Sequence, residues 1–110
     1  MADVTLDRPI PSTVLRELTG TIPRAPEAIF ATLVAAVGPR LMDAAQLLAI
    51  VQGDYWYRAE YRVSADAAGS RVDLVLLNVA ARPHWLGALT GRAAIRDAGD
   101  AFEGLLRSLG

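Results

Sequence analysis

The sequence predicts an α+β fold: an antiparallel sheet of about four to five strands, with a short N-terminal helix and a long C-terminal helix packed on one face. Three observations predict it. Apolar and polar residues alternate over residues 55–80, apolar residues recur at helical spacing over 26–37 and 85–109, and three strands follow one another directly. Sequential strands pair antiparallel, and helices outside such a run cover one face of the sheet. We expect a single domain over residues 13–110, preceded by an arm or edge strand over 1–12.

The first strand and the first helix are separated by two prolines. Residues 13–22 alternate between two faces, and one of these faces carries Val14, Arg16, Leu18, Gly20 and Ile22. Pro23 ends the strand, because proline donates no hydrogen bond to a sheet. Pro26 suits the first position of a helix, and the apolar residues that follow recur at helical spacing as far as Val37. The Gly-Pro pair after Val37 ends this helix.

The next segment is less definite in sequence. Residues 40–46 suit either a helical turn or the lead-in to a strand. Leu47–Gln52 is an apolar run that ends in Gly53 and Asp54, a turn signal. Such a short run is typical of a strand buried on both sides, although its periodicity alone also permits a helix.

The clearest pattern in the chain is a hairpin over residues 55–80. Along the first strand the three tyrosines share one face with small apolar residues, and the other face is largely charged. A turn at residues 67–69 precedes a second strand from Ser70 to Ala80. We expect Val63 to pair with Val72, a register that also places Tyr61 opposite Leu74, Ala59 opposite Leu76, Tyr57 opposite Asn78 and Arg62 opposite Asp73.

The long C-terminal helix, expected over Trp85–Leu109, is rich in small residues. Its core-facing stripe consists of Ala88, Gly91, Ile95, Ala98, Phe102, Leu105 and Leu109. Gly91 on this stripe has three interpretations: space for a ligand, close approach of helix and sheet, or a break in the helix. A glycine inside a helix costs about 1 kcal/mol relative to alanine.

Composition excludes several classes of function. The chain has no cysteine and no lysine, which excludes disulfides, thiolate catalysis and Schiff-base chemistry. A net charge of −1 argues against a strongly basic nucleic-acid surface. One histidine and scattered carboxylates argue against a metal site, and nothing indicates a cofactor. No apolar run reaches the roughly 20 residues of a membrane span, and no signal-peptide pattern is present, so we expect a cytoplasmic protein.

One local motif resembles a known family. A strand leads into Ile22, Ala25, Pro26, Glu27, Ile29 and Phe30, which is similar to the opening of the START-like (SRPBCC) helix-grip superfamily, including polyketide cyclase/dehydrase and lipid-transport proteins. The resemblance implies that the closing helix packs across the sheet over an apolar cavity. The family usually has about six or seven strands, so a sheet of four or five implies a smaller or more open cavity.

We expect a ligand-binding site on the hairpin face that carries the tyrosines. Its predicted residues are Tyr55, Tyr57, Tyr61, Leu74, Leu76 and Asn78, joined by Arg16 from the first strand and by Gly91 and Ile95 from the last helix. The hydroxyls and the Asn78 amide would orient a polar group on an otherwise apolar ligand. The alternative is structural: the tyrosines pack the core, Asn78 binds backbone, and Arg16 reaches solvent at the end of the sheet.

Three functions are consistent with this pattern. The first is binding of a hydrophobic small molecule, lipid- or polyketide-like, between the last helix and the sheet. The second is a polyketide cyclase or aromatase in which Tyr57, Tyr61 or His84 moves protons, although His84 equally suits a structural role at the helix entry. The third is a non-enzymatic interaction module that forms a homodimer.

The dimer hypothesis depends on the outer face of the hairpin. An apolar set there consists of Trp56, Val75, Leu77 and Val79, and an exposed patch of this kind favours association. An open edge of the sheet is a second route to a dimer. Alternatively, the N-terminal arm covers this face within one chain through Val4, Leu6 and Ile10.

Overall fold

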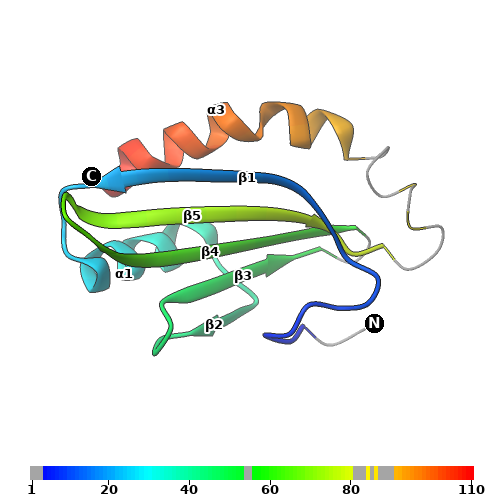
Figure 1. Ribbon diagram of the computed structural model, residues 1–110, viewed down its shortest axis with the longest axis horizontal. Helices are drawn as coiled ribbons and strands as arrows, with labels where there is room; N and C mark the ends of the chain where they lie inside the picture. The colour runs from blue at the N-terminus through cyan, green and yellow to red at the C-terminus, as the bar shows by residue number, and fades with distance from the viewer. Residues whose placement is uncertain (1–3, 54–55, 81–83, 85, 87–90) are drawn as a thin grey trace.

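The computed structural model describes residues 4–53, 56–80, 84, 86 and 91–110 and confirms the α+β class (Figure 1). Five antiparallel strands form one sheet in the order β1-β5-β4-β3-β2. Along the chain the elements are β1 (Thr13–Ile22), α1 (Pro26–Val37), β2 (Leu41–Asp43), β3 (Leu48–Gln52), β4 (Tyr57–Asp66), β5 (Gly69–Asn78) and α3 (Arg92–Leu109).

Strand β1 and helix α1 have the predicted bounds. Pro26 stands in the first turn of α1, and Glu27 lies there too, where a negative charge faces the positive end of the helix dipole. Gly38 ends the helix in the left-handed conformation (φ 58°), and its N–H donates to the carbonyl of Val34. Glycine adopts this conformation without steric cost, which explains why the helix ends there.

The ambiguous segment forms a small hairpin. Residues 41–43 form β2, which pairs with β3, and the Asp43 carboxylate accepts hydrogen bonds from the N–H groups of Ala45 and Gln46 in the turn. Leu47 has a positive φ of 51°, so β3 begins one residue later than the apolar run. Leu48, Ala49 and Ile50 are all buried, which confirms a strand covered on both sides.

The β4–β5 hairpin has the predicted register: Val63 lies opposite Val72, and Tyr61 opposite Leu74. Its turn places Gly69 at φ 129°, and a Cβ there would lie 2.7 Å from backbone atoms of Ile22 and Arg24. Only glycine fits this close approach. On the next residue, the hydroxyl of buried Ser70 donates to the carbonyl of Arg24 at 2.5 Å, which fixes the hairpin end against the β1–α1 connection.

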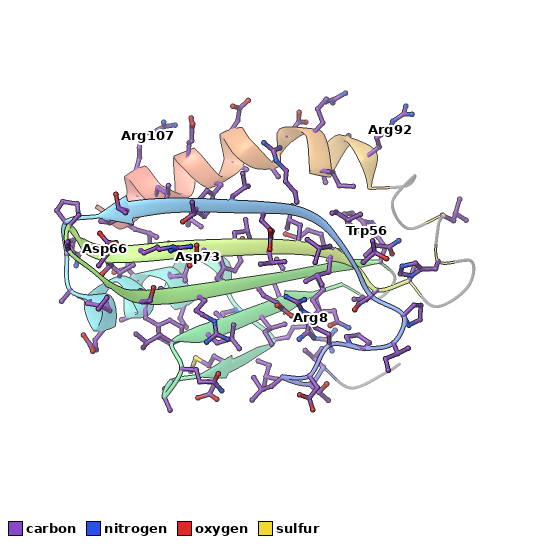
Figure 2. The ribbon with its side chains drawn as sticks, in the orientation of Figure 1. Arg8, Trp56, Asp66, Asp73, Arg92 and Arg107 are labelled. Atoms are coloured by element: carbon purple, nitrogen blue, oxygen red, sulfur yellow. The ribbon has the colours of Figure 1, made fainter. Side chains whose placement is uncertain are left out.

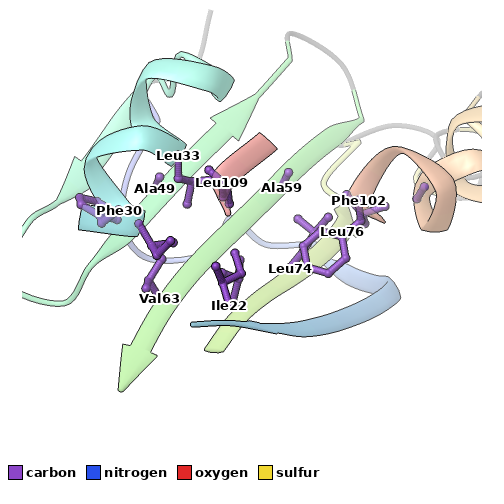
Figure 3. Packing of buried hydrophobic residues seen from close by; sticks show 13 residues of the cluster. Ile22, Phe30, Leu33, Ala49, Ala59, Val63, Leu74, Leu76, Phe102 and Leu109 are labelled. Carbon is purple, nitrogen blue, oxygen red and sulfur yellow. The ribbon is translucent and has the colours of Figure 1, made fainter. Parts of the chain in front are cut away.

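The main core lies on the inner face of the sheet, beneath both helices. Figure 3 shows its central side chains, which are Ile22, Phe30, Leu33, Ala49, Ala59, Val63, Leu74, Leu76, Phe102 and Leu109. Helix α3 contributes the predicted stripe through Ala98, Phe102 and Leu109. The Arg24 guanidinium donates to the carbonyl of Leu109 at 2.6 Å, which holds the end of α3 on the sheet.

Helix α3 begins at Arg92 with Gly91 as its N-cap residue, so of the alternatives for Gly91 the structure has the break and not a helix continuous from Trp85. A Cβ at Gly91 would overlap the indole ring of Trp56, so the glycine permits close approach of the two segments. Figure 2 places Trp56 beside the sheet near the start of α3. Residues 85 and 87–90 of the predicted helix lie outside the described residues.

The N-terminal arm lies over one end of the outer face of the sheet, opposite α1 (Figure 1), although Ile10, one of its three expected apolar contacts, is 98% exposed. Its backbone carbonyls at Thr5 and Leu6 accept hydrogen bonds from Arg58, whose side chain is completely buried. Arg58 also donates to Glu60 at 2.9 Å and to the Gln52 side chain at 2.9 Å. Arg8 of the arm, which is labelled in Figure 2, donates to Glu60 at 2.8 Å, so β3, β4 and the arm share one polar network.

The outer apolar patch proposed for a dimer is therefore not exposed. Leu77 is 0% exposed, Val79 is buried and Val75 is half-buried. Trp56 packs on Gly91 instead of joining an exposed outer patch. These positions do not offer the surface that the dimer hypothesis requires of them. Strands β1 and β2 are the two edges of the sheet, and association through an edge stays a prediction.

Candidate ligand cavity under helix α3

A cavity of about 380 Å³ lies between α3 and the inner face of β4 and β5. Helix α3 forms its roof, two strands form its floor, and the end of α1 forms part of its wall. Its lining residues are Val37, Tyr57, Tyr61, Leu74, Leu76, Ala94, Asp97, Ala98, Ala101, Phe102 and Leu105. Protein pockets for small molecules occupy about 300–1,000 Å³ and are mostly apolar, so this one belongs at the smaller end.

The cavity exists because α3 presents small side chains over the middle of the hairpin. Ala94, Ala98 and Ala101 recur at helical spacing and lie above the floor, and each of them fills only the volume of a methyl group. Phe102 and Leu105 follow them and close the space toward the core. A packed interior would fill such a gap with larger side chains.

Two arginines and a glycine hold α3 along β1 at a fixed distance. Arg16 donates to the carbonyls of Ile95 and Arg96 at 3.0 and 3.3 Å, and Arg24 binds the last turn. Between them, Gly20 of β1 lies against Leu106, whose side chain would clash with any Cβ at that position. Helix α3 therefore packs on the edge strand β1, and another of its faces lines the cavity beside β4 and β5.

Two phenols supply polar groups inside the cavity. Tyr57 and Tyr61 project from β4, and both are half-buried. Burial raises the pKa of Tyr57 and raises that of Tyr61 to about 12, with the neighbouring Tyr57 hydroxyl adding to the second shift. Both hydroxyls are therefore protonated near neutral pH, and they share a hydrogen bond with one another, which leaves each with further capacity to donate or accept. The Trp56 ring packs edge-on against the Tyr57 ring, with 5.2 Å between the two ring centroids.

Asp97 is the charged group at the cavity. Its side chain is 65% exposed, so the carboxylate lies at the mouth and not in the interior. The Arg96 side chain donates a hydrogen bond to it at 3.1 Å, which lowers the pKa of Asp97 below its ordinary value. The carboxylate is therefore ionised near neutral pH.

The structure brings together Tyr57, Tyr61, Leu74 and Leu76 of the predicted site. Tyr55 lies outside the described residues. The remaining predicted residues, which are Arg16, Asn78, Gly91 and Ile95, are not among those that line the cavity. Each of them has a structural contact instead.

The Asn78 side chain forms hydrogen bonds with the chain segment that follows β5. Its Nδ2 donates to the carbonyl of His84 at 2.6 Å, and its Oδ1 accepts from the N–H of Ala80 at 3.0 Å. His84 is held by the carbonyl of Ala80 at Nδ1 and by the Thr13 hydroxyl at Nε2, both at 2.7 Å. These bonds agree with the structural alternative that the sequence offered for Asn78 and His84.

Sequence reasoning missed Asp97 and the alanines at 94 and 101 as site residues. Ala98, Phe102 and Leu105 were on the predicted core stripe, so their position at the cavity follows from helical spacing. Ala94 and Ala101 flank that stripe, and a count of small residues on the flank would have indicated where packing is incomplete. Asp97 carries no such signal, because exposed aspartates are common on helices.

Comparisons with protein-family models, with curated proteins and with solved structures found no match to this chain. Within residues 4–53, 56–80, 84, 86 and 91–110, no helix is long and apolar enough to cross a membrane. The same described part of the chain contains no group of three or more histidine or carboxylate side chains placed to hold a metal ion.

Proposed function

We propose that the protein binds a hydrophobic small molecule, lipid- or polyketide-like, in the cavity between α3 and the β4–β5 hairpin. The observation that carries the proposal is the cavity itself: about 380 Å³ of space, walled mainly by apolar side chains, with two phenol hydroxyls on its floor. Removing apolar surface from water drives binding, and a few hydroxyls orient the bound molecule.

The order of elements also supports this proposal. A strand enters α1 through Ala25 and Pro26, an antiparallel meander follows, and a closing helix lies over the cavity. This arrangement is what the START-like resemblance leads one to expect of a hydrophobic-ligand carrier. The sheet has five strands, and the cavity is correspondingly small and partly open.

Binding is better supported than proton-transfer catalysis. A general base works best when its pKa lies near the working pH, whereas burial raises the pKa of Tyr61 to about 12. His84 is engaged by Thr13 and Ala80 and is not among the residues that line the cavity. The phenols therefore suit the orientation of a ligand, and no observation favours the cyclase alternative.

The proposal is tested by introducing a larger side chain into the cavity from helix α3. The neutral fluorescent probe 1-aminoanthracene is titrated into the purified chain, its Ala101→Phe variant and its Ala93→Phe variant. Both alanines are exposed on α3, but only Ala101 lines the cavity, so Ala93→Phe is a matched control for helix propensity and added apolar surface.

We expect saturable binding by the wild type and Ala93→Phe, and a loss of at least about tenfold in affinity for Ala101→Phe. Circular dichroism establishes that each variant is folded. Equal binding by all three chains, or no binding by the wild type either to the probe or to any member of a lipid and polyketide panel, would contradict the proposal.

A further inference from the structure

The charged and polar groups at the cavity restrict the kind of molecule that fits it. Among the described residues that line the cavity, Asp97 is the one charged side chain, and Tyr57 and Tyr61 are the neutral polar ones. All other lining residues are apolar. A ligand therefore meets an apolar interior, two hydroxyls on the floor and one carboxylate at the mouth.

No arginine is among the described lining residues. Arg96 bonds Asp97 from a side chain that is 74% exposed, and Arg16 donates to the carbonyls of Ile95 and Arg96. Arginine is the residue that best binds a ligand carboxylate, through two parallel hydrogen bonds. An anionic head group that enters this cavity has no arginine partner among the described lining residues, and it approaches the Asp97 carboxylate, whose charge Arg96 offsets only from the solvent side.

A neutral or cationic head group faces no such obstacle. A hydroxyl or carbonyl exchanges hydrogen bonds with the Tyr57 and Tyr61 hydroxyls at little desolvation cost. An ammonium group at the mouth is attracted by Asp97 while it keeps part of its hydration, because the carboxylate is more than half exposed.

We infer that the ligand is a neutral or cationic amphiphile and that the cavity selects against anionic ones such as fatty-acid carboxylates. Asp97 is the residue that sets this charge preference, and the tyrosines bind the uncharged polar group. The inference deepens the proposed function and depends on it, because it concerns what the same cavity binds.

The test uses three compounds that share an octyl chain and differ only in the head group: octylamine, octan-1-ol and octanoate. Each displaces 1-aminoanthracene from the wild type, from Asp97→Asn and from Asp100→Asn at neutral pH and low salt. Asp100 is an exposed aspartate on the same helix that does not line the cavity, so Asp100→Asn controls for the change in net charge.

We expect octylamine to bind the wild type at least about threefold more tightly than octanoate, with octan-1-ol also ahead of octanoate. Asp97→Asn should reduce the amine-to-carboxylate ratio by about two- to fivefold, whereas Asp100→Asn should leave it within about a factor of 1.5. Octanoate binding as tightly as octylamine, or an unchanged ratio in Asp97→Asn, overturns the charge preference while leaving the cavity proposal intact. A different result would contradict the proposed function itself: none of the three compounds displaces the probe, or Ala101→Phe binds them as tightly as the wild type does.

Discussion

The inner face of the sheet is apolar and leaves a cavity of about 380 Å³, whereas the outer face carries a fully buried arginine, Arg58, to which the N-terminal arm is hydrogen-bonded. Both faces are built from the same strand. Tyr57 and Tyr61 of β4 point inward, and the intervening Arg58 and Glu60 point outward. Alternation along one strand thus supplies two environments with different chemistry.

The difference between the two faces indicates which residues stabilise the fold and which are candidates for binding a ligand. On the outer face the Arg58 guanidinium bonds two arm carbonyls, an amide oxygen and a carboxylate, so its polar capacity is used within the chain. On the inner face, space and two protonated phenols remain beneath α3. The bonds of Arg58 stabilise the fold, whereas the unfilled volume beside the two phenols is where a ligand fits.

The largest expected effect comes from breaking the outer network. Arg58→Ala leaves the carbonyls of Thr5 and Leu6 and the Gln52 oxygen without their donor and empties a buried site. We expect a loss of about 3–5 kcal/mol in the free energy of unfolding, measured by urea denaturation. Binding of 1-aminoanthracene, measured where the variant is still folded, should change by less than about twofold if the faces are independent.

The matched control is Arg71→Ala, which removes an arginine from the exposed pair with Asp73. Arg71 is 54% exposed, so its loss should cost less than about 1 kcal/mol. A cost for Arg58→Ala as small as that for Arg71→Ala would show that the hydrogen bonds between Arg58 and the arm do not stabilise the fold as described.

A smaller effect is expected at Asn78, at the end of β5. Asn78→Leu removes two hydrogen bonds from the segment that includes Ala80 and His84 and should cost about 1–3 kcal/mol. Ligand affinity should change by less than about twofold, because Asn78 is not among the residues that line the cavity. Loss of binding in a variant of undiminished stability would restore Asn78 to the ligand site.

The two faces should also lose their contributions to the free energy of unfolding at opposite ends of the pH range. Burial alone would raise the pKa of Glu60, but hydrogen bonds from Arg8 and Arg58 outweigh it and hold the pKa below its ordinary value of 4.5. A carboxylate with a lowered pKa stabilises the fold above the pKa of the unfolded chain, and the contribution is lost as the pH falls through the folded value. From about pH 5 to about pH 3, stability should therefore fall less steeply in Glu60→Gln than in the wild type.

On the inner face the sign is reversed. Burial raises the pKa of Tyr61 from 10.0 to about 12, so its stabilising contribution is complete below pH 10 and is lost as the pH rises from 10 toward 12. Tyr61→Phe should flatten this alkaline decline and leave the acid limb unchanged. Urea denaturation across both limbs measures the two effects, and identical slopes for each variant and the wild type would remove the proposed contrast.

The sequence predicted the elements whose determinants are local. Pro26 and Gly38 mark the bounds of α1, and agreement between both faces of the hairpin set its register. A break at Gly91 was one of the open alternatives, and the structure places this glycine against Trp56, which is 35 residues away in the chain. Propensity alone does not reveal a contact of that kind.

The site was predicted less completely for the same reason. Alternation placed Tyr57, Tyr61, Leu74 and Leu76 on the cavity floor, because strand period determines which way a side chain points. The burial of Arg58 depends on an arm about 50 residues distant, and the place of Arg16 depends on where α3 crosses β1. Both arrangements follow from tertiary packing, so the residues next to a charged side chain on a strand do not indicate whether that side chain is buried.

A ligand that enters the cavity on the inner face should leave the outer face undisturbed. Methyl NMR on leucine-labelled protein tests it within one molecule, with octan-1-ol as the added compound. Leu74, Leu76 and Leu105 line the cavity, whereas Leu48 and Leu77 lie buried on the opposite face. We predict saturable chemical-shift changes at the methyl groups of the three cavity leucines and none at those of Leu48 and Leu77. Shift changes at Leu48 and Leu77, or none at the cavity leucines, would contradict this prediction.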